Sequence, residues 1–168
     1  MNPAQSSHIP AEGRKPALRD LPWLLVFGLR GLWELIRARI AFARLKTHEI
    51  PVRNKRAKDA SIAKPALPKA SVARITYVLP RISDRLPWRS DCMVQAIAGQ
   101  NWLAAYKAAS EIQIGVEHPQ DGEFGAHAWL LYEDTIVTGG DIEKYDLILS
   151  DSRLNPDSEV RKPLGKPD

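Results

Sequence analysis

The lone cysteine of the chain stands at the start of a predicted helix. Ser90 is a good N-cap residue and Asp91 suits a first turn, so we expect a helix from there to about residue 110, with Cys92 two residues into it. The unpaired backbone N–H groups and the positive end of the helix dipole both favour the thiolate, the nucleophilic form of cysteine. A small buried apolar residue is the alternative, because many lone cysteines serve only in packing.

A histidine on a predicted strand is the second candidate for chemistry. His127 lies between Ala126 and Ala128, and these small neighbours leave its imidazole unobstructed. A helix-start cysteine facing a strand-borne histidine is typical of papain-like and transglutaminase-like thiol enzymes, in which the imidazole pairs with the thiol and a third group orients the ring. Taken alone, His127 would be a satisfied histidine in a half-buried strand. Its combination with Cys92 favours the catalytic interpretation.

Alternating residue types predict a small antiparallel sheet after this helix. Ile112, Ile114 and Val116 alternate with polar or small residues, as in a half-buried strand. A turn at Glu133-Asp134 separates two further predicted strands, and Gly139-Gly140 ends the second of them. We therefore expect an α+β fold in which the cysteine-bearing helix packs on the sheet. The remaining strands are expected at residues 126–132, 135–138 and 145–149.

Four stretches together resemble a known enzyme family. Residues 87–96, 114–116, 126–130 and 137–140 resemble the transglutaminase-like cysteine peptidases of lasso-peptide biosynthesis, in their stand-alone form. The likeness covers roughly residues 70–150 and implies a transglutaminase-like or papain-like core, with Cys92 as nucleophile and His127 as base. It implies cleavage of the leader from a ribosomally made precursor peptide. It also implies two protein partners, a separate leader-recognition protein and an ATP-dependent macrolactam cyclase.

The third catalytic residue is where the chain departs from this family. The family's acid often falls about a dozen residues after the histidine, and that position here is Gly139. Asp141 lies two residues further and would share a strand face with position 139, if the strand continues. Pairing through the predicted turn puts Asp141 one step from His127, whereas Asp134 lies at the far end of the hairpin. We expect Asp141 to orient the ring, unless the role is dispensable or is taken by a backbone carbonyl.

An oxyanion hole needs two hydrogen-bond donors near the nucleophile. The backbone N–H of Cys92 is the expected first donor, because helix-start amides point at developing negative charge. The indole N–H of Trp88 is a candidate second donor, although this tryptophan could equally be a packing residue. No metal or other cofactor is expected, since the chain has neither an HExxH nor a CxxC motif.

Two other functions remain open at this point. The same cysteine and histidine could serve an acyltransferase or amidase acting on another peptide, because both reactions pass through a thioester. A non-catalytic module that binds a peptide is the alternative from a different class. Free leader acid as product would identify hydrolysis, and fast alkylation of Cys92 would argue against the binding module.

The segments outside the predicted core differ in composition. Residues 17–46 read as a basic amphipathic helix, in which an apolar stripe recurs at steps of three or four residues. We expect this stripe to cover the catalytic domain and the arginines to face outward, towards a protein partner or a membrane surface. The stripe consists of Leu21, Leu25, Leu29, Leu32, Ile36 and Ile40. The full expectation is a disordered tail at 1–16, this helix, a linker at 47–70, the peptidase domain at 71–150 with a first helix near 71–86, and a disordered tail at 151–168.

Charge and composition exclude several classes. The chain is 44% hydrophobic and 26% charged, which is ordinary for a globular protein. Residues 1–75 carry a net charge of +10 and residues 76–168 a net charge of −6. The acidic back half argues against nucleic-acid binding. No apolar run is long enough for a membrane span, and a lone thiol fits a reducing cytoplasm.

Overall fold

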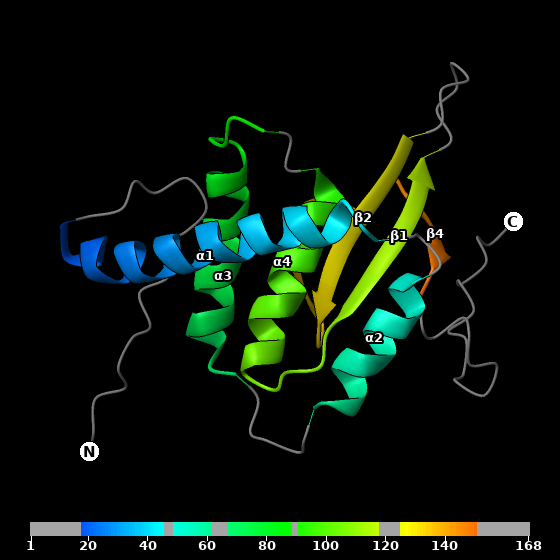
Figure 1. The fold of residues 1–168 in the computed structure, drawn as a ribbon, viewed down its shortest axis with the longest axis horizontal. Helices are drawn as coiled ribbons and strands as arrows, with labels where there is room; N and C mark the ends of the chain where they lie inside the picture. The colour runs from blue at the N-terminus through cyan, green and yellow to red at the C-terminus, as the bar shows by residue number, and fades with distance from the viewer. Residues whose placement is uncertain (1–17, 46–48, 62–66, 89–90, 118–124, 151–168) are drawn as a thin grey trace, which may run out of the picture.

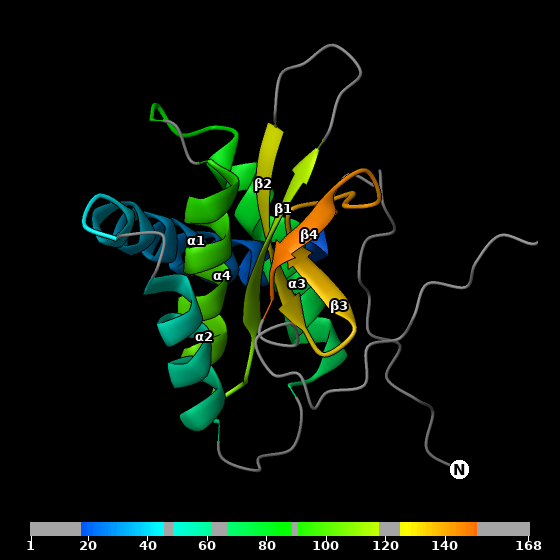
Figure 2. The same cartoon turned by 90° about the vertical axis from the view of Figure 1, so that its right-hand side faces the viewer.

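The computed structural model describes residues 18–45, 49–61, 67–88, 91–117 and 125–150. It confirms the predicted α+β class: helices pack on one side of a small antiparallel sheet (Figures 1 and 2). A short 3-10 turn, Leu18–Asp20, precedes the helices. The helices are α1 (Leu21–Phe42), α2 (Ile50–Asp59), α3 (Lys69–Ser83) and α4 (Cys92–Ala105). The strands are β1 (Glu111–Glu117), β2 (Gly125–Tyr132), β3 (Thr135–Thr138) and β4 (Asp146–Leu149).

The strands lie in the order β3-β2-β1-β4, so the chain forms a three-stranded meander and then returns to the far edge of β1. Strand β2 alternates between two environments, as the pleat requires. Ala128, Leu130 and Tyr132 join the hydrophobic core beneath α4. His127 and Trp129 therefore point to the opposite face of the sheet. The short β3 pairs only with residues 130–132, which leaves the first half of β2 open on that edge.

The prediction of a linker at 47–70 is wrong in part, because residues Ile50–Asp59 form helix α2. Its charged composition hid a buried face at helical spacing, formed by Ile50, Asn54 and Ala57. Asn54 is 1% exposed and clamps the backbone of Ile112: its Nδ2 donates to the Ile112 carbonyl at 2.9 Å, and its Oδ1 accepts from the Ile112 N–H at 2.9 Å. Gln100 also donates to this Oδ1 at 3.0 Å. The side chain of Asn54 thus substitutes for a neighbouring strand beyond the end of β4, whose pairing with β1 begins at Ile114.

Helix α1 contradicts the expected burial of its leucine stripe. Its inward residues are Gly31, Glu34, Leu35 and Ala38, whereas Leu29 of the stripe is 70% exposed. The physical reason is close packing. A Cβ on Gly31 would lie 3.0 Å from a methyl of Val78 and 3.2 Å from the ring of Trp102. Small residues therefore let α1 approach α3 and α4 more closely than a row of leucines would.

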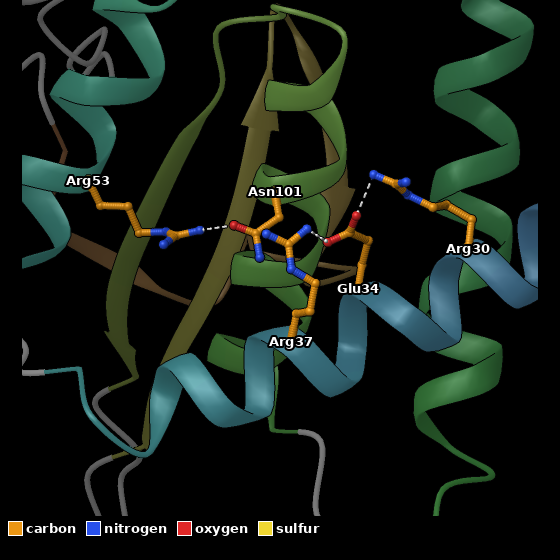
Figure 3. Close-up of polar contacts among 5 residues, drawn as sticks. All are labelled: Arg30, Glu34, Arg37, Arg53 and Asn101. Carbon is orange, nitrogen blue, oxygen red and sulfur yellow. Dashed lines mark hydrogen bonds and ion pairs between the residues drawn. The ribbon is translucent and has the colours of Figure 1, made fainter.

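Polar contacts accompany this packing (Figure 3). The fully buried carboxylate of Glu34 lies 2.6 Å from the guanidinium of Arg30 and 3.4 Å from that of Arg37, both on the same helix. Arg53 on α2 donates a hydrogen bond to the Asn101 side chain on α4. Burial lowers the pKa of the Arg53 guanidinium, and the positive charge of Arg37 adds to the effect.

Other boundaries shift by a few residues. Helix α3, expected near 71–86, runs from Lys69 to Ser83 and contains Pro80. Helix α4 begins at Cys92, with Asp91 in the N-cap position, and ends at Ala105 rather than near residue 110. Ser90 and the two predicted disordered tails lie outside the described residues. None of the described helices is long and apolar enough to cross a membrane.

Candidate active site at the start of α4

Cys92 is the first residue of α4 and is partly buried. Its Sγ accepts a hydrogen bond from the backbone N–H of Ala128 at 3.4 Å. The contact forms where the first half of β2 is left open by the short β3. The sulfur therefore lies at the positive end of a helix and receives a backbone hydrogen-bond donor.

His127, the residue before this donor, is held by a backbone carbonyl. Its Nε2 lies 2.7 Å from the carbonyl oxygen of Gly139. A carbonyl can only accept, so Nε2 carries the hydrogen. In the neutral ring Nδ1 is then the nitrogen with a free lone pair, which is the form a general base requires.

Two aromatic rings flank the imidazole. The ring of Tyr145 stacks on it with centroids 4.7 Å apart and an interplanar angle of 20°. The ring of Trp129 lies 6.2 Å away at 27°. Trp129 is itself anchored, because its Nε1 donates to Gln113 Oε1 at 2.8 Å. These contacts and the bond to Gly139 fix the orientation of the His127 ring.

Two glycines provide the space for Trp129. A Cβ on Gly115 would lie 2.8 Å from the Trp129 ring, and a Cβ on Gly139 would lie 2.3 Å from the Trp129 Cβ. Gly139 also has φ +111°, a conformation that favours glycine. A side chain at position 139 is therefore excluded, and the peptide carbonyl faces the histidine.

Comparison with known proteins gives this arrangement a family. Residues 32–150 match the transglutaminase-like superfamily. The chain belongs to the transglutaminase-like superfamily. The match extends from within α1 to the end of β4, so the front helices are part of the family domain. No curated protein and no solved structure matches the chain.

Members of the transglutaminase-like superfamily typically catalyse reactions with a cysteine, and the superfamily includes cysteine peptidases. In this transglutaminase-like domain Cys92 lies at a helix start and meets the strand that carries His127, as the sequence predicted. The sulfur contacts the backbone of the next residue, Ala128, rather than the imidazole. Catalytic hydrogen bonds are often long before substrate binds.

The acid that we expected to orient His127, Asp141, does not contact it in the described structure. Asp141 is exposed, and its Oδ1 accepts from the backbone N–H of Glu143 at 3.0 Å. Asp134 is exposed in the turn at the other end of the hairpin. The partner of His127 Nε2 is the Gly139 carbonyl. This is the backbone alternative that the sequence left open.

Trp88 keeps its place as a candidate donor. Its indole Nε1 is buried, and among the described residues it has no hydrogen-bond partner. A buried N–H without a partner carries a desolvation cost, so it is an available donor for a bound oxyanion. The described part of the chain has no group of three His, Cys, Asp or Glu side chains that could hold a metal ion.

The ring contacts of His127 were missed by the sequence reasoning. Tyr145 was assigned only to a possible strand, and nothing in its local pattern indicates stacking on residue 127. The Gly139-Gly140 pair was read as a strand breaker. The one signal in the sequence is that a glycine at position 139 can offer a partner only its backbone groups.

Proposed function

We propose that this transglutaminase-like domain is a cysteine peptidase that removes the leader from a lasso-peptide precursor through a thioester intermediate. The observation that supports it most is the pairing of two contacts on neighbouring residues of β2. The Ala128 N–H donates to the sulfur of Cys92, and His127 is held by the Gly139 carbonyl. The lasso-peptide substrate rests on the motif resemblance.

Acylation begins when the Cys92 thiol transfers its proton to His127 Nδ1 and the resulting thiolate attacks the scissile carbonyl carbon. The new C–S bond converts the carbonyl oxygen into an oxyanion, which would accept hydrogen bonds from the Cys92 backbone N–H and the Trp88 indole N–H. The C–N bond then breaks, and the leaving amine of the core peptide takes the proton from His127 Nδ1. The leader remains on the sulfur as a thioester.

Deacylation reverses the role of the histidine. Neutral His127 takes a proton through Nδ1 from a water molecule, which attacks the thioester carbonyl carbon. Collapse of the second tetrahedral intermediate releases the leader with a free carboxylic acid and the Cys92 thiolate, which takes the proton back from His127 Nδ1. The Gly139 carbonyl keeps the hydrogen on Nε2 throughout, so Nδ1 performs both transfers.

A groove beside the site suits an extended peptide. It encloses about 770 Å³ between α3 and β3, and its lining includes Gly139 and Gly140. Strand β3 is the edge of the sheet, so its outer side can receive a peptide in an extended conformation. Apolar side chains of Val72, Tyr77 and Ile136 also line the groove.

Three partners belong to the same proposal: the precursor peptide, a separate leader-recognition protein and an ATP-dependent macrolactam cyclase. The leader-recognition protein would present the precursor, and the cyclase would consume the amine that cleavage releases. We place the reaction in the cytoplasm, because a catalytic thiol must stay reduced.

The direct test uses the purified chain, a synthetic precursor and a leader-recognition protein in water enriched in oxygen-18. Hydrolysis predicts a leader acid that carries one heavy oxygen, detected by mass spectrometry, and Cys92→Ala predicts none. An acyltransferase would instead join the leader to an added amine without heavy oxygen. Absence of both products, with slow alkylation of Cys92 by iodoacetamide, would favour a binding module and overturn the proposal.

A further inference from the structure

Helix α1 and the short turn before it carry a long apolar surface that is largely exposed in the described part of the chain. Its residues recur at helical spacing, and each is at least half exposed. We call this surface the outer apolar face. It consists of Leu18, Leu21, Leu25, Val26, Leu29, Trp33 and Ile40, which are most of the large hydrophobic residues exposed in the described chain.

This face is separate from the one that holds α1 to the domain. The inward side uses Gly31, Leu35 and Ala38, so the exposed residues are not needed to bury the helix. The first half of α1 also extends beyond α3 (Figure 1). The helix is about 33 Å long at 1.5 Å per residue. A contiguous apolar surface of this length marks an interaction site.

The exposed charged residues along the helix are all positive. Residues 18–45 contain five arginines and two acids. Both acids, Asp20 and Glu34, are buried, whereas Arg19, Arg39 and Arg44 are exposed. Arg30 and Arg37 form ion pairs with Glu34, and 41% and 50% of their side chains remain exposed. The outer apolar face is therefore bordered by positive charge, and in this helix no acid is exposed.

We propose that α1 lies on the surface of an anionic lipid bilayer, with the outer apolar face turned into the headgroup boundary. Three observations select lipid over a protein groove. The face runs along most of the helix, it includes Trp33, and the charges that border it within residues 18–45 are arginines alone. Such a helix lies in the interface plane, bound by its apolar side chains and by attraction to anionic lipid. This inference does not depend on the proposed peptidase activity.

The test measures co-sedimentation of the full chain with vesicles of equal parts phosphatidylcholine and phosphatidylglycerol. We expect binding that weakens from about 0.1 M to 1 M salt, as the Debye length falls from about 10 Å to 3 Å. The triple variant Leu25→Gln, Leu29→Gln, Trp33→Gln should reduce the partition coefficient by about tenfold or more, because three apolar side chains leave the membrane. Arg39→Gln with Arg44→Gln should weaken binding to anionic vesicles and not to pure phosphatidylcholine.

Val52→Gln is the matched control, since Val52 is 49% exposed on α2 and lies off this face. It should bind vesicles as the unchanged chain does. Circular dichroism checks that each variant is folded, and the single changes at Leu25 and Leu29 serve if the triple variant is not. Lack of vesicle binding at low salt, or equal binding by the Leu25 and Leu29 variants, would overturn the proposal. So would a chain that self-associates through this face and ignores vesicles, because the occupant would then be a second copy.

Discussion

Strands β1 and β2 each contain a backbone segment that no neighbouring strand pairs with on one side. Different side chains satisfy these two segments. At Ile112, Asn54 supplies a donor and an acceptor at once, which satisfies the peptide as a strand would. At Ala128 the backbone N–H meets the sulfur of Cys92, a weaker acceptor. The first closure is complete and buried. The second leaves a partly buried thiol against the backbone of the residue that follows His127, so this strand edge is only partly satisfied.

The largest effect is expected at the sulfur. Cys92→Ala should reduce leader cleavage by about a thousandfold or more, and His127→Ala by a comparable factor, because removing a member of a catalytic unit typically costs orders of magnitude. Cleavage rates followed by mass spectrometry measure this. The double variant should be scarcely worse than either single one. More than about a tenth of the activity remaining in Cys92→Ala would remove the thiol from the mechanism.

Thermal unfolding provides the other half of this test. Cys92→Ala removes one weak acceptor at a partly buried position, so the unfolding temperature should change little. A large loss of stability would mean that Cys92 closes its strand edge structurally, as Asn54 does, and the difference between the two edges would disappear.

The second effect is on stability and concerns Asn54. Asn54→Ala would leave the Ile112 N–H and carbonyl buried without their side-chain partner, so the free energy of unfolding should fall by about 2–4 kcal/mol. Denaturant titration measures the loss. Lys55→Ala is the control, since Lys55 is exposed on the same helix and should change stability by no more than about 0.5 kcal/mol. Equal stability of both variants would contradict the clamp.

These contrasts also explain what the sequence could predict. The α+β class and the positions of Cys92 and His127 on a helix start and a strand follow from local patterns, namely N-capping and alternation. The Asn54 clamp joins residues 58 positions apart, so no local pattern contains it. The charged surface of α2 outweighed its three buried residues in the composition, which is why a linker was expected there.

The faces of α1 were confused for a related reason. Periodicity identifies a leucine stripe, and it does not say which of two apolar faces meets the domain. Gly31 and Ala38 lie on the inward side of α1 because such small residues allow the helix to approach Val78 and Trp102 closely. Small residues contribute little to a hydrophobic pattern, so packing geometry decided what periodicity could not.

The third effect is expected at Gly139. Gly139→Ala adds a Cβ 2.3 Å from the Trp129 Cβ, so the carbonyl that holds His127 must move. Cleavage should fall by about ten- to a hundredfold, since misplacing a catalytic group costs that much. Gly140→Ala is the matched control: its φ is also positive, at +64°, but its Cβ would meet nothing within 4 Å. Equal effects of the two changes would show that backbone strain alone is responsible, and the positioning role of the carbonyl would have to be abandoned.

The smallest effect is expected at Asp141, which the sequence predicts as the third group but which does not contact His127 in the described structure. Asp141 Oδ1 caps the N–H of Glu143 at an exposed position, and an asparagine keeps an oxygen there for the same bond. If the Gly139 carbonyl orients His127, Asp141→Asn should leave cleavage within about twofold, as exposed substitutions usually do. If the carboxylate swings to the ring when substrate binds, removing its charge should cost far more, because it would no longer stabilise the imidazolium. A loss above about tenfold, with unchanged thermal unfolding, would restore Asp141 to the triad and make the bond between Nε2 and Gly139 a feature of the unliganded enzyme alone.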